Sequence, residues 1–253
     1  MENTDTKTGN EGIVRELFKV GAHFGFSRVR RHPSVDKYIF GYKNKTAIID
    51  LEKTIESLEK AKAFVRQLGS EGKQVLFVGN KNEAREAVKK AALSVEMPYS
   101  AERWIGGTLT NSSQIKTRLK RLAEIKADEE SGELLKYTKK ERGLIAKDRK
   151  DLERYFGGIV NMLKMPAAMF IVDNLAESNA LAEAKIMKIP VISLSNSDCD
   201  IREIPYPIIC NDGATGSIAY FANEIASAYK EGQKNPVAPK IQTEVKVDTV
   251  TAQ

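Results

Sequence analysis

Four short segments of this chain are apolar at consecutive positions: AIIDL (47–51), QVLFVG (74–79), AMFIVD (168–173) and PVISL (190–194). Consecutive rather than alternating apolar residues are typical of strands that are covered on both faces. Apolar residues at helical spacing follow the first three segments. They are Leu51, Ile55, Leu58, Val65 and Leu68, then Ala84, Val88, Ala91 and Val95, then Leu181, Ala184 and Met187. This alternation predicts an α/β fold with a mainly parallel sheet and helices on both faces.

Residues 112–164 interrupt this alternation, because they carry two helical patterns and no strand signal. The acidic segment DEESGE (128–133) separates the two patterns. The second opens with Thr138 and Glu141, three residues apart, which is the spacing of a capping box. The apolar stripes are Ile115, Leu119 and Leu122 in the first pattern, and Ile145, Leu152 and Ile159 with Tyr155 and Met162 in the second. We expect an antiparallel coiled-coil hairpin that projects from the sheet domain.

A domain organisation follows from these patterns. The globular α/β domain is predicted to comprise residues 12–111 and 165–232, with a last helix near 217–230. Residues 1–11 and 233–253 lack large apolar clusters and are predicted to be flexible tails.

Positive charge is concentrated outside the predicted sheet. The 253-residue chain has a formal net charge of +6, whereas residues 15–45 carry +6 and residues 116–164 carry +5. The remainder is therefore acidic, and a polyanionic partner is expected at the two basic segments.

The densest basic cluster is SRVRRHP (27–33), in a segment where glycine, proline and histidine argue against regular structure. Arginines on a loop can each make bidentate contacts with phosphate oxygens, which position a folded RNA without reading its sequence. A solvated basic loop is the alternative. Phe24 and Phe26 beside the arginines could stack on bases or anchor the loop in the core. The candidate RNA-binding residues are Arg28, Arg30, Arg31, His32, Lys43 and Lys45 in this region, and Arg103, Lys116, Arg118, Lys120 and Arg121 at the base of the hairpin.

No catalytic, cofactor or metal site is predicted. Neither GxGxxG nor GxxxxGK[ST] occurs at the expected strand ends, so the sequence does not encode a phosphate-binding loop. Two cysteines and two distant histidines have no zinc spacing. Asp198 and Asp200 flank Cys199, but aspartates in such loops usually serve turns and helix caps. We find no secretory signal and no apolar stretch of the ~20 residues needed to cross a bilayer, so a cytoplasmic location without membrane contact is expected.

The stretch RWIGGTLTN (103–111), which contains the only tryptophan, could be a phosphate cradle, a tight turn or a docking point. The surrounding motifs help to choose between these interpretations. FVGNKNEA (77–84), RWIGGTLTN, AMFIVD and EAKIMKIPVISL (183–194) occur in this order. GAHFGF (21–26) and HPSVDKYIFG (32–41) precede them, and YPIICNDGATGSI (206–218) follows. Together, from about Leu17 to Gly232, they resemble the bacterial small-subunit ribosomal protein S two family.

The resemblance implies a flavodoxin-like sheet with a coiled-coil hairpin and a non-catalytic role in the ribosome. It also implies contact with small-subunit rRNA and neighbouring ribosomal proteins, and docking of ribosomal protein S one where that protein exists. On this interpretation, Gly106 and Gly107 turn the chain into the hairpin, Trp104 wedges its root, and Thr110 or Asn111 caps its first helix. Departures from the family pattern include Phe26, His32 and Asp198. Two alternative hypotheses remain: a flavodoxin-like enzyme or nucleotide sensor, and a coiled-coil adaptor whose hairpin binds another protein.

Overall fold

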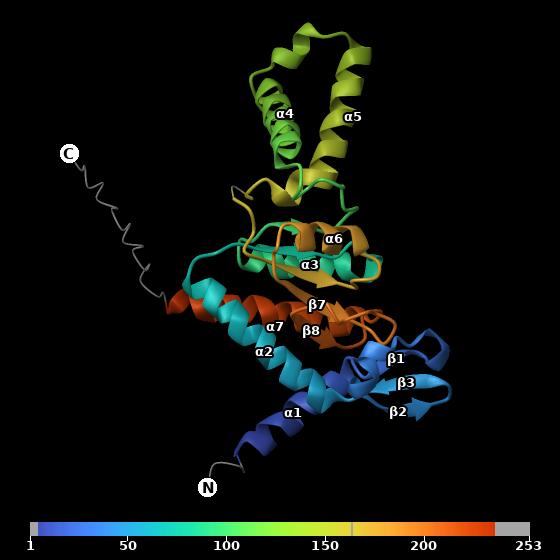
Figure 1. Ribbon diagram of the computed structural model, residues 1–253. Helices are drawn as coiled ribbons and strands as arrows, with labels where there is room; N and C mark the ends of the chain where they lie inside the picture. Colours follow the sequence, from blue (N-terminus) through green and yellow to red (C-terminus); the bar gives the residue numbers. More distant parts are fainter. Residues whose placement is uncertain (1–4, 163, 236–253) are drawn as a thin grey trace, which may run out of the picture.

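The computed structural model describes residues 5–162 and 164–235 (Figure 1). Its centre is a five-stranded parallel sheet in the order β5-β4-β6-β7-β8. The strands are β4 (Val75–Val78), β5 (Tyr99–Ser100), β6 (Ala168–Val172), β7 (Val191–Ser195) and β8 (Tyr206–Ile209). Three of the four apolar segments therefore form parallel strands as predicted, whereas β5 and β8 were not predicted.

Helices cover both faces of this sheet, which confirms the α/β prediction. Alternate strand residues face opposite layers, so that Phe77 and Phe170 pack with one set of helices while Leu76 and Met169 pack with the other. The first layer holds α2 (Leu51–Ser70), α3 (Asn82–Ser94) and α7 (Thr215–Lys234), and the second holds α6 (Ser178–Ile186) and the hairpin root.

The first apolar segment, AIIDL, does not belong to the parallel sheet, so that prediction is wrong. It forms β3 (Thr46–Ile49), the middle strand of a separate antiparallel sheet with β1 (Phe24–Ser27) and β2 (Ile39–Lys43). Only Ala47 and Ile49 of β3 are buried, because one face of this small sheet is more exposed. We call residues 24–49 the arm. It also contains two 3₁₀ turns, Arg28–Arg30 and Pro33–Tyr38, so the expectation of irregular structure is corrected too.

Helices extend into both of the segments predicted to be tails. Helix α1 (Asp5–Lys19) includes residues 5–11, where a flexible tail was expected. At the other end, α7 continues to Lys234. Residues 1–4 and 236–253 of the predicted tails lie outside the described residues.

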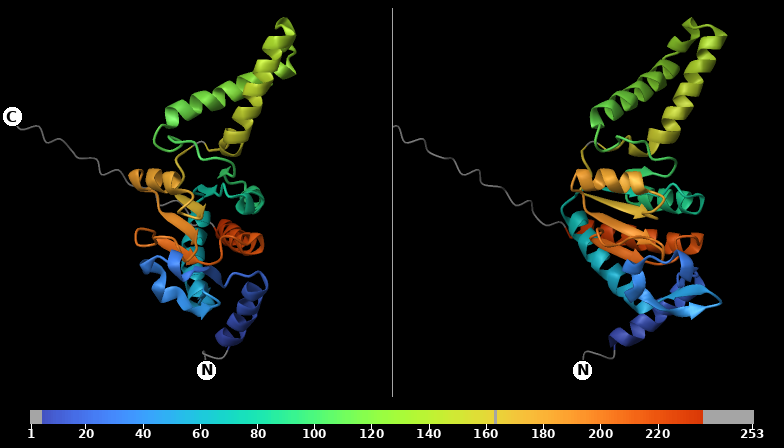
Figure 2. Two further views of the ribbon diagram at one scale, coloured as in Figure 1. Left: turned by 90° about the vertical axis from the view of Figure 1, so that its right-hand side faces the viewer. Right: turned by 45° about the vertical axis from the view of Figure 1, so that its right-hand side comes forward.

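The hairpin consists of α4 (Ser112–Glu130) and α5 (Lys139–Phe156), and it projects away from the sheet (Figures 1 and 2). The predicted capping box is present: the Thr138 N–H donates to the Glu141 carboxylate at 2.9 Å, and the Glu141 N–H donates to the Thr138 hydroxyl at 3.4 Å. The buried contacts lie at the root, where Ile115, Leu122 and Leu152 join the core under α6. Ile159 is buried there as well, but it follows the end of α5.

Candidate nucleic-acid interface

A tight turn at the tip of the arm gathers three of the predicted cations. Asn44 and Lys45 have φ values of +50° and +66°, and positive φ at both central residues is typical of the two-residue type I′ hairpin turn. Lys43 pairs with Thr46 across this turn, and the Arg28 N–H donates to the Lys45 carbonyl at 3.2 Å. The pairing of β1 and β2 with β3 therefore brings Arg28, Lys43 and Lys45 together.

The cations at this tip are available to an external partner. Arg28, Arg30, Lys43 and Lys45 are exposed, and none of them forms an ion pair within the described part of the chain. The Arg28 guanidinium lies 5.5 Å from the centre of the Tyr42 ring, and that of Arg30 lies 5.9 Å from the Phe26 ring. A ring beneath a guanidinium fixes its plane and leaves the N–H groups at its edge free to donate.

Arg31 and His32, although predicted for the same role, have partners inside the protein. Arg31 lies 2.9 Å from the Asp36 carboxylate and donates to the Tyr42 hydroxyl at 3.0 Å. The His32 N–H donates to the Ser197 carbonyl at 2.8 Å, and its ring contacts the Ser34 hydroxyl and lies 3.8 Å from Asp200. His32 therefore attaches the arm to the loop after β7, whereas the partners of Arg31 lie within the arm.

The predicted cations at the hairpin root are separate from those of the arm. Arg103, Lys116 and Arg118 are exposed and have no ion pair among the described residues, whereas Lys120 and Arg121 each lie 3.9 Å from Glu124. The arm and the hairpin lie at opposite ends of the molecule, with the parallel sheet between them (Figures 1 and 2). An RNA that contacts both surfaces must therefore extend along the protein.

A buried glutamate holds the stretch RWIGGTLTN at the hairpin root. Glu183, in α6, is 8% exposed, and its carboxylate accepts hydrogen bonds from the Trp104 indole at 2.9 Å and from the Gly107 and Leu109 N–H groups at 2.8 and 2.9 Å. The Thr110 N–H and hydroxyl also donate to it. Burial opposes ionisation, but these donors outweigh it and hold the pKa of Glu183 below its ordinary value. Glu183 was not predicted as a site residue, although it lies three positions after the buried Ala180, on the inward side of α6.

Two details of the predicted hinge are corrected by the structure. Asn111 is the residue before α4, but its side chain makes no capping hydrogen bond to the backbone, and the Thr110 side chain binds Glu183 instead. Of the two glycines, only Gly107 has a positive φ, +89°. A side chain at Gly107 would be strained, whereas a Cβ at Gly106 would meet open space.

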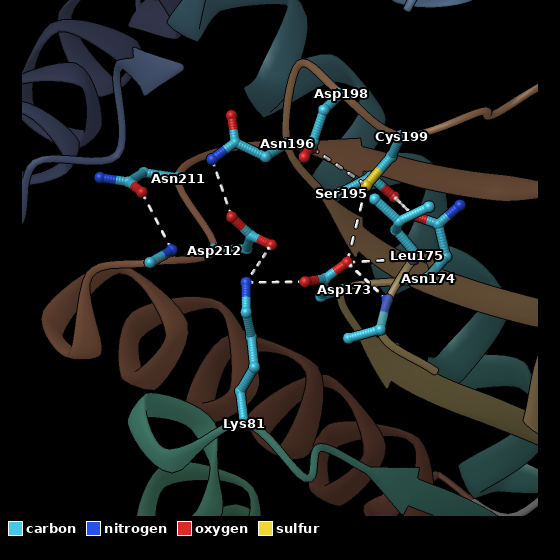
Figure 3. A network of polar contacts seen from close by, with 12 residues as sticks. Lys81, Asp173, Asn174, Leu175, Ser195, Asn196, Asp198, Cys199, Asn211 and Asp212 are labelled. Atoms are coloured by element: carbon cyan, nitrogen blue, oxygen red, sulfur yellow. Dashed lines mark hydrogen bonds and ion pairs between the residues drawn. The ribbon is translucent and has the colours of Figure 1, made fainter. Parts of the chain in front are cut away.

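The carboxyl ends of the parallel strands carry a network of charged side chains centred on Lys81 (Figure 3). Its Nζ lies 2.7 Å from the Asp173 carboxylate and 2.8 Å from that of Asp212. Asn196 donates to the other oxygen of Asp212 at 2.7 Å. Burial would lower the pKa of Lys81, but the two carboxylates raise it above its ordinary value. The lysine nearest a conventional phosphate site is therefore neutralised by carboxylates of the same chain.

The neighbouring residues of this edge are likewise partnered within the chain. Burial raises the pKa of the Cys199 thiol, so it is protonated at neutral pH and is a poor nucleophile. Asp200 is ion-paired with Arg202. Glu177 accepts hydrogen bonds from the Asn80 N–H and side-chain amide, and burial raises its pKa to about 7.

The described residues contain no group of three or more histidine, cysteine, aspartate or glutamate side chains placed to hold a metal ion. Both cysteines are free and buried. No helix in the described part of the chain combines the length and apolar character needed to span a membrane.

Comparison with known proteins agrees with the fold and with the ordered motifs. The sequence model of the ribosomal protein S2 family matches residues 17–232, from α1 to the end of α7. Small ribosomal subunit protein uS2 of Sulfurimonas denitrificans is 40% identical over 220 residues, which cover 87% of this chain and 85% of that protein. Both matches cover most of the chain, so this chain belongs to the ribosomal protein S2 family.

Proposed function

We propose that the chain binds small-subunit rRNA through two surfaces, the tip of the arm and the root of the hairpin. As a member of the ribosomal protein S2 family, it is a structural component of the small ribosomal subunit. The observation that supports the proposed contacts most strongly is the pairing state of the cations: Arg28, Arg30, Lys43 and Lys45 are exposed and have no ion pair among the described residues.

Exposed cations without an ion pair can bind RNA phosphate groups without first breaking an interaction inside the protein. Each phosphate contact releases condensed counterions, which makes the affinity steeply dependent on salt. Arg31 would contribute by holding the shape of the arm, through Asp36 and Tyr42, and His32 would contribute by holding the arm against the loop after β7. Arg103, Lys116 and Arg118 would form the second contact at the hairpin root.

The arm contact is tested with Arg28→Ala, Arg30→Ala and Lys43→Ala combined in one variant. The matched control is Lys89→Ala, Lys90→Ala and Lys230→Ala, which removes three exposed cations that form no ion pair among the described residues. Binding of the full chain to small-subunit rRNA is measured by filter retention at several salt concentrations. Three lost phosphate contacts are expected to reduce the salt slope by roughly 2 to 3 in the arm variant.

The control should retain a slope close to that of the unaltered protein. Equal slopes for the two variants would show that the arm makes no special contact with RNA. Combining Arg103→Ala, Lys116→Ala and Arg118→Ala then tests the hairpin root, and losses that add in free energy would mean two independent contacts.

Docking of ribosomal protein S one is a finer proposal, which rests on the resemblance to the family. Its test is copurification of that protein with small subunits that contain or lack this chain. Loss of S one only when the chain is absent would support it, and unchanged S one would contradict it.

A further inference from the structure

A groove of about 920 Å³ separates α1 from the first half of α2, at the end of the molecule far from the hairpin (Figures 1 and 2). Each helix contributes four residues with the spacing i, i+3, i+4 and i+7, so one face of each helix lines the groove. They are Glu11, Val14, Arg15 and Phe18 of α1, and Glu52, Ile55, Glu56 and Glu59 of α2.

The floor of the groove is apolar. Phe18 is 50% exposed, Val14 is half-buried and Ile55 is buried at the base. An apolar strip between two helices matches the apolar face of a third helix, which is a common way of binding a peptide. The groove therefore offers a hydrophobic contact to a helical partner.

The rim of the groove is acidic, in contrast to the net charge of +6 of the whole chain. Four of its eight residues are glutamates and only Arg15 is basic. Glu11, Glu52 and Glu56 form no ion pair within the described part of the chain. Glu59 lies beside Lys62 and Arg66, but these two cations also bind Glu224 and Glu231 of α7.

The acidic rim and apolar floor of the groove distinguish between RNA and a basic protein segment as partners. Carboxylates on the rim repel phosphate, so RNA is disfavoured at the groove, whereas lysine or arginine side chains beside an apolar strip are complementary to it. We propose that the groove between α1 and α2 binds a basic amphipathic helix of a neighbouring protein. This inference goes beyond RNA binding by the arm and the hairpin root, and it does not depend on it.

The probe is an 18-residue peptide of leucine and lysine, with leucine at helical spacing, labelled for fluorescence anisotropy with the full chain. We expect saturable binding at one peptide per protein. Glu11→Lys combined with Glu56→Lys should weaken it by about tenfold, because one charge on each wall is reversed. The matched control, Glu86→Lys with Glu130→Lys, makes the same change in net charge at exposed helical sites and should have little effect.

Two further measurements separate a groove from general electrostatics. Phe18→Ser should weaken peptide binding without changing charge, and a peptide with serine in place of leucine should bind poorly. The proposal is wrong if the leucine peptide does not bind, if both charge-reversal variants lose equal affinity, or if the serine peptide binds as well. Retained rRNA binding by Glu11→Lys with Glu56→Lys would show that the groove and the RNA surfaces act separately.

Discussion

The tip of the arm and the carboxyl edge of the sheet both contain basic side chains, but they use them in opposite ways. At the arm, Arg28 and Lys43 are exposed and have no ion pair among the described residues. At the sheet edge, Lys81 lies between the carboxylates of Asp173 and Asp212. A cation is available to phosphate only if the protein has not already paired it, so the charge of a segment is a poor guide to binding until its partners are known.

The largest effect is expected from Lys81→Met. Removing the lysine leaves Asp173 and Asp212 close together in a buried site, and losing one partner of such a group costs about 3 to 5 kcal/mol. We expect the free energy of unfolding in urea to fall by that order, while rRNA affinity of the folded protein at moderate salt is unchanged. A large loss of affinity without loss of stability would instead place Lys81 in the RNA interface.

Adding Asp212→Asn to Lys81→Met serves as the control. If the lysine acts by neutralising the carboxylates, the second substitution should restore part of the stability, and a double-mutant cycle should show coupling between the two sites. Simple addition of the two losses would contradict this account.

Glu183 is the acidic counterpart of Lys81, a buried charged group with its partners inside the protein. Its carboxylate accepts several hydrogen bonds and forms no ion pair among the described residues. Glu183→Leu would leave the Trp104 indole and the Leu109 N–H without an acceptor, at a cost of roughly 1 to 3 kcal/mol for an unsatisfied buried group. We expect a loss of about 3 kcal/mol in stability and faster hydrogen exchange at residues 104–110. Exchange elsewhere that rises equally would mean global unfolding rather than release of the hairpin root.

The parts of this molecule that the sequence predicts are those specified by local patterns. Consecutive apolar residues were sufficient to predict strands β4, β6 and β7. The spacing of Thr138 and Glu141 was sufficient to predict where α5 begins. AIIDL was misplaced because a short apolar run does not show which sheet it joins; only its partners β1 and β2 do so.

The same limit applies to the candidate sites. The sequence predicted the cations of the arm as a group, but it could not separate Arg31, which binds Asp36, from Arg28, which has no ion pair among the described residues. The role of Glu183 was missed because its donors lie more than seventy residues away in sequence. Long-range pairing, rather than composition, determined what could not be predicted.

The smallest of these effects concerns two buried glutamates that respond to pH in opposite directions. Glu183 has many donors and a lowered pKa, so its contribution to stability is present above its ordinary value of 4.5 and is lost as pH falls through its folded pKa. Among the described residues the Glu177 carboxylate accepts hydrogen bonds from Asn80, and burial raises its pKa to about 7. Its folded form holds a proton more tightly than the unfolded chain, so stability should fall as pH rises from about 4.5 to about 7.

Urea unfolding at closely spaced pH values tests this, with Glu177→Gln as the comparison variant. Glu177→Gln removes this titration. The difference in free energy of unfolding between the variant and the unaltered protein should therefore change by about 2 kcal/mol between pH 5 and 7.5. A constant difference would show that Glu177 titrates normally in the folded protein. Below pH 4.5 the dependence of stability on pH should be unchanged in Glu177→Gln and smaller in Glu183→Leu, because of these two glutamates only Glu183 has a lowered pKa.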